Sequence, residues 1–298
     1  MNYKNITIAG SGVLGYQIAF QTAFHGFHVT VYDINDTVLE KAKAKFETLS
    51  KAYKRDLKAS EQKIEKTRKN LRYSSNLAEA VKDADLLIEA VPENPTIKIE
   101  FYKKLAKVAP AKTVFATNSS TLLPSQFSEF TGRPTKFLAL HFANTIWIHN
   151  TAEIMGHPTT DPEVFKDVVA FAKAIGMLAL PLHKEQPGYI LNSLLVPMLS
   201  AATDLLVSEV AEVETIDKTW MKATGAPLGP FGILDVVGIT TAYNIDKMTA
   251  EKTKDELKIK TVNYLKENFI DKNKLGVSTG EGFYKYPNPA YEDPDFLK

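Results

Sequence analysis

The sequence predicts an α/β protein, in which a doubly wound, mostly parallel sheet is followed by an all-helical carboxyl-terminal domain. Short apolar runs typical of buried strands alternate with helix-period segments as far as residue 182. Beyond residue 184 the strand pattern disappears, and residues 188–270 carry helical periodicity that breaks only around residues 225–230. A chain of 298 residues is long enough for two domains. We therefore expect one domain at 1–183 and a second at 184–298.

The expected strands lie at residues 6–9, 28–32, 86–90, 114–117, 137–141 and 177–182. Residues 37–70 are expected to be helical and strongly charged. The proline-rich end from Pro287 onward is expected to be a loose tail.

Composition excludes several classes of protein. The formal net charge of +1 argues against a nucleic-acid-binding chain. Cysteine is absent and the histidines show no metal-ligand spacing, so we expect neither disulfides nor a metal site. The first strand pattern begins too near Met1 for a signal peptide, and no apolar run approaches the length of a membrane span. We expect a cytoplasmic protein without membrane contact.

A glycine-rich turn, Gly10-Ser11-Gly12-Val13-Leu14-Gly15, lies between the first expected strand and a helix. This context is the one in which such a motif binds a dinucleotide in a Rossmann-type domain. Gly10 permits the tight turn, Gly12 lets the backbone approach the pyrophosphate, and Gly15 lets helix and strand pack closely. Asp33 ends the next strand and can accept hydrogen bonds from ribose hydroxyls, and no arginine follows it. NAD is therefore favoured over NADP as the cofactor.

Polar residues suited to alcohol oxidation follow the later strands. His141 closes one strand and can exchange a proton near neutral pH, and Glu153 could orient its ring. Ser120 ends another strand, and Asn192 opens the helical domain; both could hold the reacting oxygens. Spacing alone leaves open the alternative that His141 is a structural residue at the end of a buried strand.

The chain resembles the L-3-hydroxyacyl-CoA dehydrogenases, including the short-chain 3-hydroxybutyryl-CoA enzymes, over nearly its full length. The resemblance rests on separated segments in the right order, which are residues 10–15, Glu89-Ala90-Val91-Pro92-Glu93-Asn94, Asn118-Ser119-Ser120, Leu140-His141-Phe142, Pro187-Gly188-Tyr189-Ile190-Leu191-Asn192, Gly229-Pro230-Phe231 and Gly280-Glu281-Gly282-Phe283-Tyr284. It implies an NAD-dependent enzyme of fatty acid metabolism that acts on an acyl-CoA and forms a homodimer through its carboxyl-terminal domain.

The same resemblance assigns roles to individual residues. The catalytic histidine of the family falls on His141 and its glutamate on Glu153, while the substrate-binding serine and asparagine fall on Ser120 and Asn192. Glu93 and Lys98 fall where the family contacts the nicotinamide side of the cofactor.

Two departures from the family pattern concern the substrate. Where the family has His-Phe-Phe-Asn-Pro, this chain has His141-Phe142-Ala143-Asn144-Thr145, and residues 146–151 also differ from the usual run. Ser193 stands where the family has an arginine. The proposed base and its carboxylate are retained, but the shape of the substrate pocket does not follow from the resemblance.

The stretch from Lys41 to Arg72 contains twelve Lys or Arg and four Asp or Glu. It is interpreted either as a solvated helix pair or as a site for the phosphates of coenzyme A, in which case the resemblance points to Thr48 and Arg55. No aromatic platform accompanies these charges, so nucleic acid is not expected.

Two alternatives to the acyl-CoA dehydrogenase stay open at this stage. One is an NAD-dependent dehydrogenase of a CoA-free 3-hydroxy acid, such as carnitine or gulonate, suggested by the unusual residues 143–151. The other is a dinucleotide-binding protein without catalysis, against which the complete set of Ser120, His141, Glu153 and Asn192 counts.

Overall fold

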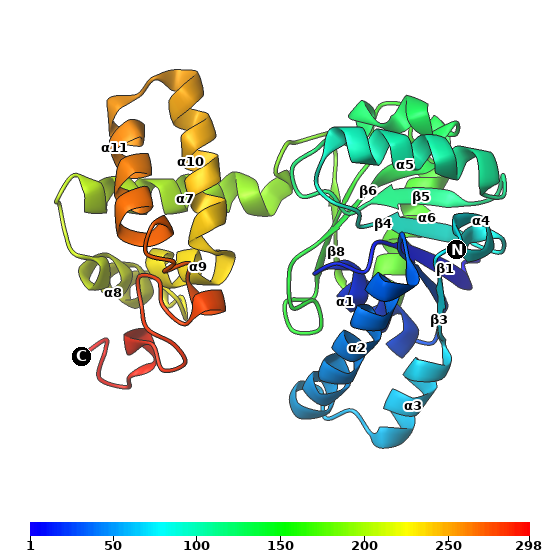
Figure 1. The fold of residues 1–298 in the computed structure, drawn as a ribbon, viewed down its shortest axis with the longest axis horizontal. Coiled ribbons are helices and arrows are strands. Elements are labelled where there is room, and N and C mark those ends of the chain that lie inside the picture. Colours follow the sequence, from blue (N-terminus) through cyan, green and yellow to red (C-terminus); the bar gives the residue numbers. More distant parts are fainter. The chain divides into compact units, whose positions relative to one another are not determined.

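The computed structural model describes residues 1–298, which form two compact units, Met1–Ile190 and Leu191–Lys298 (Figure 1). The first unit is built around an eight-stranded sheet. The spatial order of the strands is β3-β2-β1-β4-β5-β6-β7-β8. The strands are β1 (Asn5–Ala9), β2 (His28–Tyr32), β3 (Leu71–Ser74), β4 (Leu86–Glu89), β5 (Val114–Thr117), β6 (Phe137–Phe142), β7 (Thr151–Met155) and β8 (Leu178–Leu182).

The doubly wound α/β class is confirmed. The pairs formed among strands β1 to β6 are all parallel, β7 is antiparallel to β6, and β8 is parallel to β7. The strand order reverses beside β1, with β2 on one side and β4 on the other. Ligands of open α/β sheets bind at the carboxyl ends of the strands beside such a switch point.

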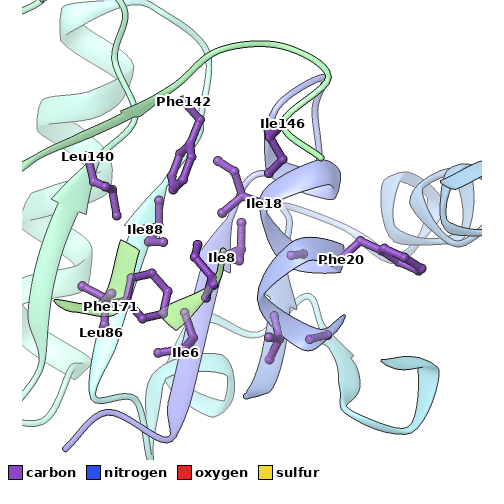
Figure 2. Close-up of a cluster of buried hydrophobic side chains, with 14 of the residues drawn as sticks. Ile6, Ile8, Ile18, Phe20, Leu86, Ile88, Leu140, Phe142, Ile146 and Phe171 are labelled. Atoms are coloured by element: carbon purple, nitrogen blue, oxygen red, sulfur yellow. The ribbon is translucent and has the colours of Figure 1, made fainter. Parts of the chain in front are cut away.

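Helices cover both faces of this sheet. The helices of the first unit are α1 (Gly15–Phe24), α2 (Asp36–Asp56), α3 (Glu61–Lys69), α4 (Leu77–Val81), α5 (Pro95–Val108) and α6 (Pro162–Ala174). Alternate strand residues enter two separate clusters, because successive side chains of a strand point to opposite faces. Ile8 packs with Ile18 of α1 and Phe171 of α6 (Figure 2), whereas Ala9 packs with Tyr102 of α5.

Two of the strands do not follow from the sequence pattern. The edge strand β3 contains Arg72, which is exposed, and pairs only with β2. Strand β7 carries Glu153 at its centre, which hides its apolar pattern. Each strand interrupts its run of apolar residues with a charge, which is why neither is recognisable by periodicity.

The second unit is helical, as expected. It contains α7 (Tyr189–Val207, whose first two residues belong to the first unit), α8 (Val213–Thr224), α9 (Pro230–Val237), α10 (Ile239–Thr253) and α11 (Glu256–Leu265). The division falls after Ile190 rather than after residue 183, since Tyr189 packs with Ala139 and Met155 of the sheet.

One buried carboxylate joins two of the glycine-containing motifs of this unit. Asp217 of α8 accepts hydrogen bonds from the amides of Phe231 (2.9 Å) and Gly232 (3.1 Å) at the start of α9, and from the Tyr284 hydroxyl (2.9 Å). A Cβ atom at Gly229 would lie 2.2 Å from Cγ of Asp217. The glycine is therefore required because the carboxyl group occupies the place of its side chain.

The carboxyl-terminal segment is not a loose tail, contrary to the expectation. Phe296 is 7% exposed and packs in the same cluster as Tyr284 and Leu199. The prolines end regular structure there, but aromatic side chains still dock the segment on the helices.

Helix α7 is an apolar segment of nearly the length of a membrane span, contrary to the expectation that the chain has none. Its 19 residues have a mean hydropathy of 1.7, so it could cross a membrane by length and composition alone. Core and interface helices of soluble proteins pass the same criterion, and α7 contains Pro197 together with the polar Asn192 and Asp204. Only 22% of the helix is buried within the structure.

Candidate active site

The glycine turn after β1 has the geometry that a dinucleotide requires. Gly10 adopts a φ of +98°, and a Cβ atom there would lie 2.5 Å from the carbonyl oxygen of Ala90. A Cβ at Gly15 would lie 1.8 Å from the carbonyl oxygen of Gly10. In contrast, nothing lies within 4 Å of a Cβ built at Gly12. The first and third glycines are thus needed for packing, and the second keeps open the space in which a phosphate can approach the helix N-terminus.

A cavity of about 800 Å³ lies in front of this turn and is lined by Gly10, Gly12, Asp33, Val91, Lys41 and Lys45 among others. Asp33 accepts hydrogen bonds from the amide (2.7 Å) and hydroxyl (2.6 Å) of Ser11, which fix its carboxylate at the end of β2. The open cradle at Gly12 and the fixed carboxylate fit the pyrophosphate and ribose of a dinucleotide. Lys41 and Lys45 add positive charge to this cavity that the sequence analysis did not place there.

His141 and Glu153 form a buried pair. They lie opposite one another on the antiparallel strands β6 and β7, so their side chains share one face of the sheet. His141 Nδ1 lies 3.0 Å from Glu153 Oε2, and the two residues are 6% and 4% exposed. The other carboxylate oxygen of Glu153 accepts the amide of Ile190 at 2.8 Å. The imidazole ring is therefore oriented by a carboxylate that is itself held by the backbone.

Ser120 and Tyr189 complete the surroundings of the imidazole ring. The hydroxyl oxygen of Ser120 lies 3.2 Å from His141 Nε2. Tyr189 stacks on the ring with centroids 4.6 Å apart and planes 24° apart, and its hydroxyl donates to the carbonyl oxygen of Ser119 at 2.7 Å. The tyrosine adopts a φ of +56° directly after Gly188 at +78°. The role of Tyr189 in stacking on the imidazole does not follow from its position in the sequence.

Glu93 and Lys98 form an ion pair next to Ser119. Lys98 Nζ is 3.3 Å from Glu93 Oε2, and Glu93 Oε1 accepts the Ser119 hydroxyl at 2.5 Å. Burial alone would raise the pKa of Glu93, but the Ser119 hydroxyl and the Lys98 ammonium outweigh it and hold that pKa below its usual value. Lys98 also pairs with Glu89, a fully buried residue that the sequence analysis did not single out.

Three other predicted substrate residues lie on helices. Thr48 and Arg55 are exposed on α2, and the guanidinium of Arg55 donates to both carboxylate oxygens of Asp56 at 2.6 and 2.9 Å. Arg55 and Trp147 hold the pKa of Asp56 down to about 2. Asn192 belongs to α7 in the second unit.

The atypical segment after His141 is anchored on α1 and α2. Gln17 of α1 donates to the Asn144 side chain (2.7 Å) and accepts the amide of Thr145 (2.9 Å), which adopts a φ of +61°. Trp147 Nε1 donates to Asp56 at 2.9 Å. These contacts hold a β-branched residue in the left-handed region, which requires support from the surrounding structure.

The doubly wound fold and the glycine turn with its cavity define a dinucleotide-dependent dehydrogenase. Residues 5–186 match the family model described as 3-hydroxyacyl-CoA dehydrogenase, NAD binding domain, and residues 188–286 match the C-terminal domain of the same family. The chain therefore belongs to the 3-hydroxyacyl-CoA dehydrogenase family and is an NAD-dependent oxidoreductase.

Individual relatives agree with this assignment. The chain is 35% identical to the mitochondrial hydroxyacyl-coenzyme A dehydrogenase of Homo sapiens, covering 95% of this chain and 91% of the human protein. It is 31% identical to a probable 3-hydroxybutyryl-CoA dehydrogenase of Bacillus subtilis, covering 96% and 98%. A solved diketoreductase, described in connection with substrate-directed dual catalysis of dicarbonyl compounds, is 57% identical with a TM-score of 0.90, covering 96% of this chain and 100% of that one.

Proposed function

We propose that the protein reversibly oxidises the C3 hydroxyl group of a short-chain 3-hydroxyacyl-CoA, such as 3-hydroxybutyryl-CoA. One observation carries this proposal. The imidazole of His141 contacts a buried carboxylate through Nδ1 and the Ser120 hydroxyl through Nε2. This is the arrangement that a general acid–base catalyst of alcohol oxidation needs.

The hydrogen-bond partners assign the tautomer of His141. An ionised carboxylate only accepts, so Nδ1 carries the proton and donates it to Glu153. Nε2 is then the acceptor, and the Ser120 hydroxyl donates to it in the absence of substrate. A substrate hydroxyl that takes this position can pass its proton to Nε2, and the resulting imidazolium is stabilised by Glu153.

The chemistry balances in both directions. When bound, the nicotinamide of NAD accepts the hydride that leaves C3 as the substrate O–H proton moves to His141. In reduction, protonated His141 returns a proton to the oxygen of the 3-oxo group. We assign to Ser120 the role of holding the reacting oxygen, and to Asn192 that of holding the neighbouring thioester carbonyl.

The test of this proposal is the oxidation of NADH with acetoacetyl-CoA, followed by absorbance. We expect turnover in the wild type and a loss of about 10³-fold or more in His141→Ala. His183→Ala, which changes an exposed histidine at the end of β8, is the matched control and should retain activity. Unchanged NADH oxidation in His141→Ala would remove the proposed base.

Recognition of the CoA moiety is assigned to α2. Thr48 and Arg55 are exposed there among the basic residues of the stretch 41–72, and a guanidinium can bind a phosphate bidentately. Under this proposal Arg55→Ala weakens the affinity for acetoacetyl-CoA and leaves that for a CoA-free 3-oxo substrate unchanged.

A second candidate function is the reduction of a CoA-free dicarbonyl compound. Two observations favour it: the 57% identity to the diketoreductase, and the engagement of Arg55 by Asp56, whose carboxylate stands where a phosphate would have to approach. A substrate panel that varies both the chain length and the CoA group discriminates the two. Turnover of a CoA-free dicarbonyl compound without turnover of acetoacetyl-CoA would select the second function.

The oligomeric state proposed is a homodimer formed through the carboxyl-terminal unit. Helix α7 supports it, since Leu194 and Leu205 are 70% and 43% exposed on a helix of mean hydropathy 1.7. Apolar surface of this kind is typical of obligate subunit contacts. Size-exclusion chromatography with light scattering tests the dimer. A role in fatty acid metabolism and a cytoplasmic location, without membrane contact, are proposed on the family resemblance.

A further inference from the structure

Glu89 is a charged residue with no exposed surface, at the carboxyl end of β4. Its Oε1 accepts Lys98 Nζ at 2.6 Å and the amide of Val91 at 2.9 Å. Its Oε2 accepts the hydroxyls of Tyr102 (2.9 Å) and Thr117 (2.8 Å). Each carboxylate oxygen is thus satisfied twice, as a buried charge requires.

Lys98 of α5 connects Glu89 to Glu93. It is 1% exposed, and its ammonium lies between Glu89 Oε1 at 2.6 Å and Glu93 Oε2 at 3.3 Å. An ammonium group held between two carboxylates has little freedom to move, because a displacement would leave the buried Lys98 or Glu89 charge without its partner. The position of the ammonium therefore determines where the Glu93 carboxylate can stand.

Glu93 in turn holds the backbone of residues 119–121. Besides the Ser119 hydroxyl, its Oε1 accepts the amides of Ser120 (3.1 Å) and Thr121 (3.2 Å) and the Thr121 hydroxyl (3.1 Å). Ser120 is the residue whose hydroxyl contacts His141 at 3.2 Å. Three carboxylate and ammonium groups therefore form a continuous path from the buried end of β4 to the side chain beside the base.

We propose that Glu89 is a positioning residue that acts through Lys98 and Glu93 to hold Ser120 against His141. This inference rests on the proposed roles of Ser120 and His141. It assigns to a buried carboxylate outside the reacting centre a part in the chemical step, in addition to its contribution to the packing of β4, β5 and α5.

The alternative is that Glu89 is needed only for folding, since Tyr102 and Thr117 also depend on it. The two roles are separable at Tyr102, whose hydroxyl meets only Oε2; Thr117 does not separate them, because its hydroxyl also accepts the amide of Ser119 at 3.2 Å. Tyr102→Phe removes one bond to Oε2 and leaves the path intact. It should lower the melting temperature without changing kcat.

The test is a double-mutant cycle of Glu89→Gln and Glu93→Gln, with kcat, KM for acetoacetyl-CoA and the Kd of NADH by fluorescence. A displacement of Ser120 costs catalysis about tenfold to a hundredfold. We expect each single variant to lose kcat by this amount with KM changed less than about threefold. The double variant should be no slower than the slower single variant, because both act on one path. Glu163→Gln, which breaks an exposed pair with Lys166, is the control.

Two results would overturn the inference: additive losses of kcat in the double variant, or wild-type kcat in a folded Glu89→Gln variant. If Glu89→Gln does not fold, Glu89→Asp is used in its place, since it retains the charge but shortens the side chain. We expect Glu89→Asp to lower kcat. Wild-type kcat in a folded Glu89→Asp variant would also refute the path. A failure of the proposed function gives a different result: no turnover of acetoacetyl-CoA by the wild type, or unchanged NADH oxidation in His141→Ala.

Discussion

Replacement of Glu153 by Gln separates the charge of the carboxylate from its shape. Its Oε2 lies 3.0 Å from His141 Nδ1, so the charge centres of an imidazolium and this carboxylate would be about 4 Å apart. At an effective dielectric constant of about 20, two unit charges at that distance attract by about 4 kcal/mol. Since 1.36 kcal/mol corresponds to a tenfold change in rate, we expect Glu153→Gln to lower kcat by about a hundredfold to a thousandfold.

The assay is steady-state reduction of acetoacetyl-CoA, or of the dicarbonyl substrate that the panel selects, with NADH absorbance. The Kd of NADH should be unchanged, because Glu153 does not line the cavity in front of the glycine turn. Glu163→Gln again serves as the control for loss of a glutamate charge. A folded Glu153→Gln variant with kcat within about threefold of the wild type would refute the idea that this carboxylate stabilises the protonated ring.

Three further predictions follow from other contacts. Gly10→Ala should cost about 2 kcal/mol or more of stability, measured by denaturant unfolding, whereas Gly12→Ala should keep the fold and weaken NADH binding. Asp56→Asn should lower KM for acetoacetyl-CoA by about threefold at low salt, because it frees Arg55, and should leave KM for a CoA-free substrate unchanged; an unchanged KM for the CoA substrate would contradict a role of Arg55. Burial raises the pKa of Asp246, so its ionisation lowers the stability of the fold once the pH rises above the pKa of an aspartate in the unfolded chain. The melting temperature of Asp246→Asn relative to the wild type should therefore increase between about pH 4 and pH 7. A difference in melting temperature that does not change with pH would contradict this prediction.

The dinucleotide turn could be predicted from the sequence because local chemistry determines it. Glycines at positions 10, 12 and 15 have few other uses between a strand and a helix, and Asp33 follows at the end of the next strand. The contact between His141 and Glu153 was also predicted, and the structure places their side chains 3.0 Å apart, although this contact depends on β7, a strand that the sequence pattern does not reveal.

The remaining features depend on tertiary contacts that no local pattern shows. Glu89 looks like the polar end of an ordinary strand until Lys98 and Tyr102 are seen to meet it. Only the folded chain shows that Trp147 reaches Asp56 on α2. Likewise, only the folded chain shows which lysines of the basic stretch, Lys41 and Lys45, line the cofactor cavity.

The shared carboxylate of Asp217 has an evolutionary consequence. Because a single group fills the space above Gly229 and receives the Tyr284 hydroxyl, these three positions cannot accumulate changes independently. Any side chain at 229 is excluded while the aspartate stands, and loss of the aspartate would strand the phenol in the interior. Epistasis among them should therefore be strong, and homologues should either keep the whole trio or replace it together.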